Sequence, residues 1–341
     1  MTTVSVLGAS GYSGVELVRI LARRSDVEVV SAMASRQAGQ RLDVLYPDLA
    51  GRFDHVLKPT DPARAADAEV VFVALPSGES MQIVPELRTR GARVVDLGGD
   101  FRLRTAEQYE RAYGRPHAAP ELLGEAVYGL PELNRARIAQ SSLVANPGCY
   151  PTSAVLSLLP PLRARVIDPG SIAITSMSGV SGAGRSSAVE LSFGEVNENI
   201  RAYRVGAHQH QPEISAILED ATGVAATVSF VPHLIPITRG IYTTVTAQCT
   251  KEMSSAEVLA LFREAYAGEP FVRIKDSVPE IRSVRHTNFC DIGVMIDPQS
   301  GRLIIISTID NMLKGAAGQA VQNMNIMLGL NEEVSLAWTP G

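Results

Sequence analysis

The chain has 341 residues, of which 45% are hydrophobic and 20% are charged, and its formal net charge is −5. This length suffices for two domains, and the composition is that of an ordinary water-soluble globular protein. The mild negative charge gives no long-range attraction to nucleic acid or to anionic lipid, so we expect neither as a partner.

Strand-like and helix-like segments alternate along the first 150 residues. Near-continuous apolar strands separated by helices indicate a Rossmann-type, doubly wound parallel sheet of the α/β class. A stretch rich in proline and glycine, residues 113–133, is expected to be an irregular connection. The expected strands are 4–9, 27–34, 68–76 and 92–99, and the expected helices are 13–24 and 79–90.

From about residue 150 the expected strands are longer and fewer helices separate them. Segments 170–180, 226–249 and 302–310 are long and apolar, which suggests a mixed or antiparallel sheet in a second, α+β domain. Residues 312–328 have a strongly helical pattern. We expect this last helix to pack back on the first domain.

The cysteines and the N-terminus indicate a cytoplasmic protein. The three cysteines lie far apart, so they predict neither a disulfide framework nor a zinc site. The opening MTTVSVLGASG lacks the basic region of a signal peptide, and no apolar run reaches the roughly 18 residues of a membrane-spanning helix. We therefore expect a cytoplasmic, reduced protein that binds no metal.

The segment GASGYSG follows the first strand and opens the first helix. Glycines let the backbone approach a phosphate, and a helix N-terminus offers free N–H groups and a favourable dipole. The spacing G-x-x-G-x-x-G alone also fits an ordinary tight turn, but a second strand about 20 residues later favours dinucleotide binding. The candidate cofactor residues are Gly8, Ser10, Gly11, Tyr12, Ser13 and Gly14.

The end of the second strand indicates which dinucleotide is bound. An NAD site usually has an Asp or Glu there, which holds the ribose 2′-hydroxyl. Here ASRQAGQR contains no carboxylate, whereas Ser35 and Arg36 suit a 2′-phosphate. We expect NADP(H) rather than NAD; the alternative for Arg36 is a solvated surface charge.

Cys149 lies in ANPGCYPT, just before an apolar, helix-like run. A thiolate attacks carbonyl carbons, and a helix N-terminus or an imidazolium can lower its pKa. The glycine at 148 would let a substrate approach closely. A buried, inert thiol is the alternative, and Cys249 and Cys290 fit it. Because Pro and Gly directly precede Cys149 and would interrupt a core strand or helix, we predict that Cys149 is a nucleophile.

The segment VGAHQHQPEI supplies an imidazole for acid–base work or for stabilising a thiolate. In an extended segment His208 and His210 would point opposite ways, so only one would face the thiol. We expect this to be His210, because Pro212 and Glu213 resemble a helix start. His208 would then be structural or contact substrate, and His233 is the next candidate. The pair has no third ligand at a sensible spacing, so a metal site is not expected.

Two further motifs are either ligand-binding sites or exposed segments that bind no ligand. SGVSGAGRS, from Ser178 to Ser186, is a candidate cradle for phosphate or nicotinamide, or a flexible loop. DLGGDFRLR carries Arg102 and Arg104 past the end of a strand, where α/β proteins bind ligand anions. We take Arg102 as a substrate contact, with a surface charge as the alternative for either arginine.

NADP, a reactive cysteine and a histidine together indicate reduction of an activated acyl group through a thioester, with release of an aldehyde. Over essentially its whole length the chain resembles the N-acetyl-γ-glutamyl-phosphate reductase family of arginine biosynthesis. The resemblance rests on nine motifs in this order: GASGYSG, ALPSGES, DLGGDFRL, YGLPEL, NPGCYPT, SGVSGAGR, HQHQPEI, FVPHLIPITRGI and DNMLKGAAGQAVQNMN.

The resemblance implies an NADPH-dependent, phosphorylating aldehyde dehydrogenase that converts N-acetyl-γ-glutamyl phosphate to N-acetylglutamate 5-semialdehyde and phosphate. It implies a dinucleotide-binding domain of residues 1–148 and 312–341, and a catalytic, substrate and oligomerisation domain of residues 149–311. A homo-oligomer, dimer or tetramer, is expected. It also adds Ser77, Asn311 and Lys314 to the candidate cofactor residues.

Three alternatives differ in chemistry. An aspartate-semialdehyde dehydrogenase would act on a shorter acyl phosphate, but the H-x-H-x-P-E-I segment and YGLPEL point away from it. A non-catalytic NADP sensor would keep the nucleotide motifs, need no thiol in a turn, and still bind NADP after alkylation of Cys149. A cysteine hydrolase is disfavoured by the nucleotide motif.

Overall fold

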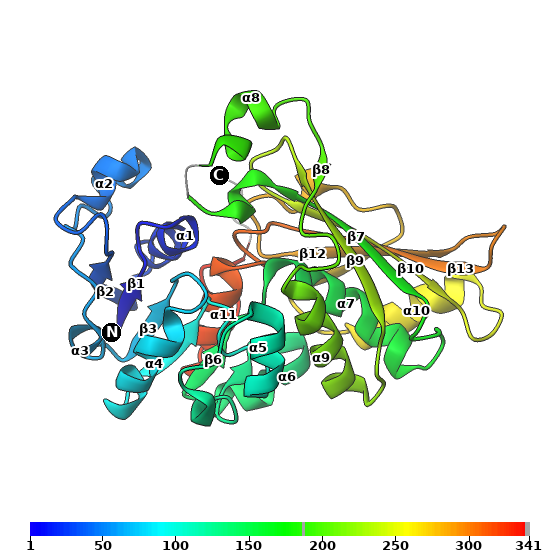
Figure 1. The fold of residues 1–341 in the computed structure, drawn as a ribbon, viewed down its shortest axis with the longest axis horizontal. Coiled ribbons are helices and arrows are strands. Elements are labelled where there is room, and N and C mark those ends of the chain that lie inside the picture. The colour runs from blue at the N-terminus through cyan, green and yellow to red at the C-terminus, as the bar shows by residue number, and fades with distance from the viewer. Residues whose placement is uncertain (186–187, 338–341) are drawn as a thin grey trace. The chain divides into compact units, whose positions relative to one another are not determined.

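The computed structural model describes residues 1–185 and 188–337 (Figure 1). It divides into two compact units, the first formed by Met1–Pro147 with the chain from Ala316 onward, the second by Gly148–Gly315. Ser186 of the SGVSGAGRS motif and residues 338–341 of the expected dinucleotide-binding domain lie outside the described residues. Among the described residues, no helix has both the length and the apolar character needed to cross a membrane.

The first unit contains a six-stranded sheet whose pairs are all parallel. The order β2-β1-β3-β4-β6-β5 puts β2 and β3 on opposite sides of β1, so the direction of winding reverses there. This confirms the expected doubly wound α/β sheet. The strands are β1 (Thr2–Leu7), β2 (Val27–Met33), β3 (Val70–Val73), β4 (Arg93–Asp96), β5 (Val127–Tyr128) and β6 (Leu143–Ala145).

Helices connect these strands, and the last helix of the chain, α11, also belongs to this unit. The entire α11 is buried, and it contacts α1 and α6. The main helices are α1 (Tyr12–Leu21), α4 (Ser80–Thr89), α5 (Ala106–Tyr113), α6 (Pro131–Ala139) and α11 (Ala317–Met327). Short helical turns are α2 (Leu42–Leu45), η1 (Pro47–Leu49), α3 (Pro62–Ala65) and η2 (Pro120–Leu122).

Two expectations for this unit were wrong in detail. The stretch 113–133 is not wholly irregular, because it contains η2, β5 and the start of α6. The two residues of β5 become a strand only by pairing with Val144 and Ala145, which local composition does not reveal. The expected helix 312–328 begins only at Ala317, because the Asp310 side chain accepts the N–H groups of Met312 and Leu313 and holds a turn there.

The second unit contains a seven-stranded mixed sheet, as expected. Its order is β11-β12-β13-β10-β7-β9-β8, with parallel pairs β11–β12 and β7–β9 and antiparallel pairs elsewhere. The strands are β7 (Ile172–Gly179), β8 (Arg201–Ala202), β9 (Val228–Ile235), β10 (Ile241–Gln248), β11 (Val272–Lys275), β12 (Cys290–Ile296) and β13 (Arg302–Ile309).

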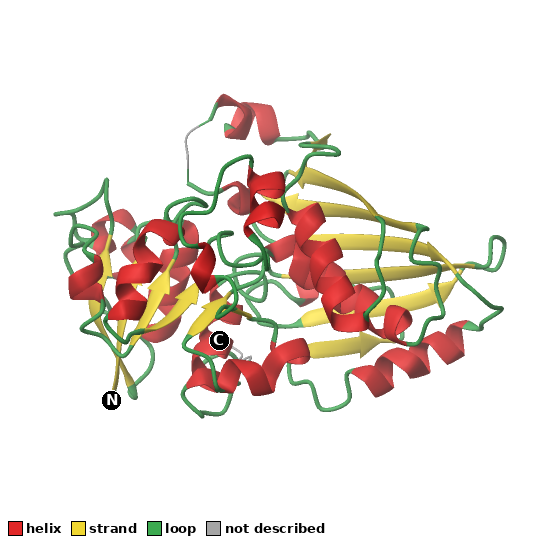
Figure 2. Ribbon diagram, turned by 60° about the horizontal axis from the view of Figure 1, so that its bottom comes forward, coloured by secondary structure: helices red, strands yellow, loops and turns green. Residues whose placement is uncertain are grey.

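Three helices lie over one face of this sheet (Figure 2). They are α7 (Cys149–Arg163), α9 (His210–Thr222) and α10 (Ser255–Ala265), and they contact β10, β9 and β12 respectively. Buried and half-buried residues alternate along β10, as a sheet with one covered face requires. The remaining short elements are η3 (Val180–Ala183), η4 (Val189–Leu191), α8 (Phe193–Val196) and η5 (Ile281–Ser283).

The unit boundaries differ slightly from those expected from the sequence. Gly148 belongs to the second unit rather than the first. Residues 312–315 also belong to the second unit, because the Asp310 turn ties them to the end of β13.

Candidate active site

In the first unit, the glycine motif forms the turn between β1 and α1. Gly8 has φ +81°, and a Cβ there would lie 2.2 Å from the carbonyl oxygen of Ala74, just past β3. A Cβ at Gly14 would lie 2.2 Å from the Gly8 oxygen, so the first turn of α1 packs directly on the loop. Gly11 precedes the helix, and its nearest contact is an ordinary 3.4 Å. Gly8 and Gly14 are thus required by close packing, while Gly11 leaves room in front of the helix.

The N-terminus of α1 is suited to an anion. Among the described residues, no side chain caps it, and its first turn contains no acidic residue. The N–H groups of Tyr12, Ser13 and Gly14 have no acceptor within the helix itself. Ser10 Oγ donates to Gln37 Oε1 at 2.9 Å, which ties the turn to the segment after β2. Phosphate oxygens are the ligands that such a helix start favours.

Ser35 and Arg36 follow β2 by two and three residues, and both are exposed. Ser35 Oγ lies 3.2 Å from Thr60 Oγ1. The nearest carboxylate after them in the chain, Asp43, is paired with Arg41 at 2.7 Å. An exposed hydroxyl and guanidinium, with no carboxylate between residues 34 and 41, fit a 2′-phosphate.

Ser77 and Arg102 lie near the carboxyl ends of β3 and β4. A Cβ at Gly99 would lie 2.9 Å from Ser77 Oγ, so the segment after β4 backs the loop that carries Ser77. Arg102 is buried and donates to the carbonyl oxygens of Asn146 and Leu97, both at 2.8 Å. These bonds give Arg102 a structural role, and substrate binding by Arg102 stays a prediction.

In the second unit, Cys149 is the first residue of α7 and is half-buried. This placement puts the thiol at the positive end of a helix dipole, which stabilises a thiolate. A Cβ at Gly315 would lie 2.8 Å from Cys149 Cβ and 2.7 Å from the Asn311 oxygen, so the Asp310 turn packs against the thiol residue. By contrast, Cys290 is fully buried at the start of β12, and Cys249 lies beyond the end of β10.

His208 and His210 lie side by side, because the extended backbone under which we expected them to point opposite ways is not formed. The segment is not extended, because Gln209 has helical angles (φ −60°, ψ −18°) and α9 begins at His210 itself. The two ring centroids are 4.7 Å apart. Both rings also meet the ring of Tyr150, the residue after the candidate nucleophile, at 5.7 and 5.8 Å. The histidine segment therefore lies beside the start of α7.

The two histidines differ in environment. His208 is buried, and its Nδ1 accepts the backbone N–H of His210 at 3.1 Å. Burial, and secondarily the charge of Arg204, lower the pKa of His208 to about 4. His208 is therefore a neutral ring at neutral pH, with its proton on Nε2. His210 is half-buried and is the better candidate for a group that gains and loses a proton.

Sequence reasoning missed the role of Glu213. Its carboxylate is 1% exposed and accepts the Gly148 N–H at 2.9 Å. This bond links the first turn of α9 to the residue before Cys149. From the sequence, Glu213 is only part of a helix start, because its partner Gly148 lies 65 residues away in the chain. Tyr150 was also missed; its hydroxyl lies 2.9 Å from that of Tyr203.

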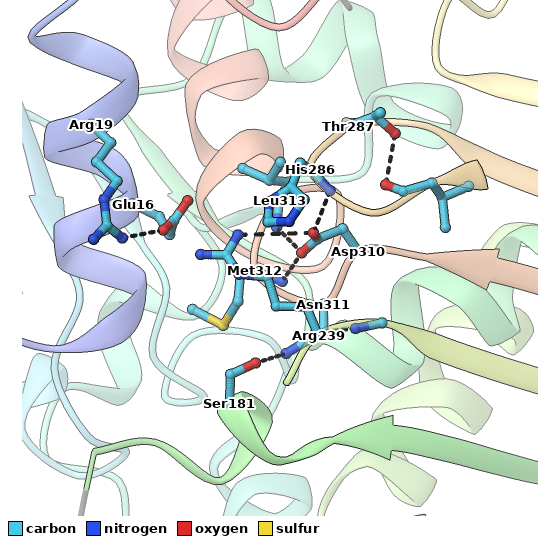
Figure 3. A network of polar contacts seen from close by, with 12 residues as sticks. Glu16, Arg19, Ser181, Arg239, His286, Thr287, Asp310, Asn311, Met312 and Leu313 are labelled. Atoms are coloured by element: carbon cyan, nitrogen blue, oxygen red, sulfur yellow. Dashed lines mark hydrogen bonds and ion pairs between the residues drawn. The ribbon is translucent and has the colours of Figure 1, made fainter. Parts of the chain in front are cut away.

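Asn311 joins three loops of the second unit (Figure 3). Its amide donates to Ser181 Oγ at 3.0 Å and accepts the Gly240 N–H at 2.8 Å. The neighbouring Asp310 is buried, and Arg239 Nη1 lies 3.8 Å from it. The SGVSGAG and ITRG segments thus meet at the turn that packs on Cys149. Sequence reasoning had not singled out Arg239.

The cofactor residues expected near the C-terminus lie in this turn. The amide bonds of Asn311 are formed within the second unit, so its contact with a cofactor stays a prediction. Lys314 is fully buried, with its Nζ 5.6 Å from the centre of the Phe271 ring.

Two family models match the two units separately. A semialdehyde dehydrogenase NAD-binding domain matches residues 3–141, and a semialdehyde dehydrogenase dimerisation domain matches residues 149–311. Among solved structures, aspartate semialdehyde dehydrogenase II of Vibrio cholerae, complexed with ASA, covers 96% of this chain and 98% of its own, with TM-score 0.71 and 16% identity. The Candida albicans enzyme with NADP covers the same shares, with TM-score 0.72 and 16% identity. These likenesses show the fold.

Curated relatives are much closer in sequence. N-acetyl-γ-glutamyl-phosphate reductase of Citrifermentans bemidjiense is 47% identical, over 100% of this chain and 99% of its own length. The Symbiobacterium thermophilum reductase is 48% identical, over 98% of this chain and 97% of its own length. Identity of this extent across both units, together with the two domain matches, confirms the resemblance seen in the motifs: the chain belongs to the N-acetyl-γ-glutamyl-phosphate reductase family.

Proposed function

We propose that the protein catalyses the NADPH-dependent reduction of N-acetyl-γ-glutamyl phosphate to N-acetylglutamate 5-semialdehyde and phosphate, a step of arginine biosynthesis. The observation that carries this proposal is the placement of Cys149 at the N-terminus of α7, with the histidine segment beside it. Membership of the family supports the choice of substrate.

Cys149 begins the reaction as the nucleophile. Its sulfur attacks the γ-carbonyl carbon, the bond between that carbon and the phosphate oxygen breaks, and phosphate leaves with the bonding electrons. The product is a thioester on Cys149. The dipole of α7 and a protonated His210 both favour the thiolate that this attack requires. Arg102 is our candidate contact for the departing phosphate.

The first unit would hold NADPH, which supplies a hydride when bound. The turn from Gly8 to Gly14 and the N-terminus of α1 would hold the pyrophosphate. Ser35 and Arg36 would hold the 2′-phosphate, and Ser77 and Asn311 are further candidate contacts.

His210 is our candidate for the proton work after acylation. A protonated imidazole beside the sulfur can donate to the oxygen of the tetrahedral intermediate and stabilise its charge. When that intermediate collapses, its oxygen returns the proton to His210, the bond between carbon and sulfur breaks, the aldehyde forms, and Cys149 leaves as a thiolate. Glu213 supports this geometry, because its bond to the Gly148 N–H holds α9 against the residue before the thiol.

The reverse reaction tests the proposal. N-acetylglutamate 5-semialdehyde, phosphate and NADP+ should give NADPH, detected by its absorbance, and omission of phosphate should stop the reaction. Aspartate semialdehyde serves as the matched control substrate and should react far more slowly. Turnover of aspartate semialdehyde alone would assign another acyl phosphate. Tight NADP+ binding without turnover of either aldehyde would indicate a sensor.

We also infer that the protein acts in the cytoplasm as a homo-oligomer, a dimer or a tetramer. The match of residues 149–311 to a dimerisation domain supports self-association. Light scattering coupled to gel filtration measures the mass of the particle directly. A 36.5 kDa species at all micromolar concentrations would contradict the inference.

A further inference from the structure

A cluster of buried polar side chains lies behind the loop that follows β3, in the first unit. It consists of Ser80 at the start of α4, Asp96 at the end of β4, Asp100, and Tyr109 of α5, and we call it the Asp100 cluster. All four residues are 0% exposed. Apolar side chains such as Met81 and Phe101 surround it. Two carboxylates in such a core are costly unless hydrogen bonds compensate for the lost water.

Asp100 receives most of these bonds. The Gly78 N–H lies 2.7 and 2.9 Å from its two carboxylate oxygens, and the Met81 N–H donates at 3.1 Å. The hydroxyls of Ser80 and Tyr109 each donate at 2.8 Å. Three of these four donor groups belong to the loop and to the first turn of α4. One buried side chain therefore holds both ends of the segment from Gly78 to Met81.

The loop does not hold this conformation by itself. Gly78 has φ +97°, a region that glycine enters and leaves easily, so local preference does not select it. A Cβ at Gly78 would lie 2.2 Å from Arg115 Nη1, so a guanidinium lies directly against it. The bonds to Asp100 select one of the loop's accessible conformations.

Asp96 has a different part in the cluster. It accepts the Gly98 N–H at 2.9 Å and lies 3.2 Å from Ser80 Oγ, and its carboxyl group has fewer donors than Asp100. Burial, and then the charge of Asp100, raise the pKa of Asp96 to about 7. Near neutral pH, Asp96 is thus partly a neutral acid, and the N–H groups of Gly78 and Met81 face Asp100 instead.

The loop occupies the position where a ligand is expected in this fold. An open α/β sheet binds its ligand outside the carboxyl ends of the strands, where the winding reverses. That point lies between β1 and β3, and the Ala74 carbonyl packs against Gly8 there. The residues just after Ala74 therefore border the glycine turn on its β3 side.

We propose that Asp100 is a positioning residue for the dinucleotide: it fixes Ser77 and Gly78 in the conformation that lines the cofactor site beside the Gly8 turn. This rests on the proposed function, since it assumes that the Gly8 turn binds NADP(H). Fixing the loop in advance lowers the entropy cost that cofactor binding would otherwise incur. Asp100 acts through the loop and not on the reacting atoms.

The test compares Asp100→Asn with Tyr109→Phe, each measured for the Kd of NADP+ by calorimetry and for thermal stability. An asparagine has one acceptor oxygen, and its amide group would face the loop N–H donors. We expect Asp100→Asn to raise the Kd about tenfold, the effect of one lost charged hydrogen bond. Tyr109→Phe removes the one donor from outside the loop, so it should lower the Tm and change the Kd less than about twofold. The alkylation rate of Cys149 should stay unchanged in both.

Equal changes of the Kd in the two variants, or none in Asp100→Asn, would overturn the proposal and leave Asp100 a purely structural residue. If Asp100→Asn fails to fold, Ser80→Ala is the second variant, because it removes one loop donor and keeps the Asp100 side chain. It should raise the Kd about threefold, and an unchanged Kd would equally overturn the proposal. Failure of the unmodified protein to bind NADP+ would instead contradict the proposed function.

Discussion

Replacement of His208 by asparagine should remove a pH-dependent part of the free energy of unfolding. In the folded chain this ring is 5% exposed, and its Nδ1 accepts the His210 N–H, which only an unprotonated Nδ1 allows. Burial is the main cause that lowers its pKa from 6.5 to about 4. The unfolded ring therefore binds a proton more readily than the folded one. The stabilisation is fully present above about pH 6.5 and is lost as the pH falls toward 4.

The two pKa values set the magnitude. The pKa of His208 is about 4 in the folded chain and 6.5 in the unfolded chain. Linkage therefore predicts that the neutral ring contributes about 2.5 kcal/mol less to the free energy of unfolding at pH 4.5 than at pH 7.5. The hydrogen bond to the start of α9 adds about 1 kcal/mol, as for a helix cap. His208→Asn should thus destabilise the protein at pH 7.5 and become progressively less harmful on acidification.

Urea unfolding followed by circular dichroism, at about five values between pH 7.5 and 4.5, measures this difference. At each pH, the free energy of unfolding of the variant is subtracted from that of the unmodified protein. This difference cancels the contribution of carboxylates that titrate in the same range. The control is His55→Asn, which makes the same substitution at an exposed histidine. A difference for His208→Asn that stays constant with pH would show that the folded ring is not held neutral, and the assignment of roles within the histidine pair would fail.

Three further predictions concern the chemistry. Arg36→Asp should weaken NADP+ binding and improve NAD+ binding, with a change in the ratio of the two Kd values of roughly tenfold or more, and equal Kd values in the unmodified protein would contradict the 2′-phosphate assignment. Cys149→Ser should bind NADP+ normally but lose nearly all turnover, because an alcohol attacks poorly without a strong base, whereas Cys249→Ser should be close to silent. His210→Asn should lower turnover and raise the apparent pKa seen in Cys149 alkylation; if only His208→Asn does so, the roles are reversed, and if neither does, His233 is the next candidate.

The sequence by itself determined the fold class and the reaction class. Residues 70–73 form an apolar run that is buried on both faces, and helices separate it from the neighbouring strands in the chain, a pattern that only a covered parallel sheet explains. Gly8 and Gly14 could be recognised because their need for close packing is local to one strand–turn–helix unit. Cys149 stood out for the same reason, since its Pro–Gly context and the helix after it are written in consecutive residues.

Other features depended on partners far away in the chain. β5 exists only because β6 pairs with it, and the start of α11 is delayed because the Asp310 side chain binds the N–H groups that a helix would otherwise use. Neither effect leaves a periodic pattern in the sequence. Propensity and spacing therefore failed at both places.

The polar groups behind the candidate site were decided by tertiary structure alone. His208 and His210 share one side because Gln209 is helical, and Glu213 acquires a role only when α9 lies beside α7. Asp100 appeared in the sequence merely as a residue after a glycine pair. Asp100 matters because it is buried. Burial removes water from its carboxyl group, and the N–H groups of Gly78 and Met81 replace the lost hydrogen bonds. Burial is a property of the packed chain, so no local pattern could have revealed it.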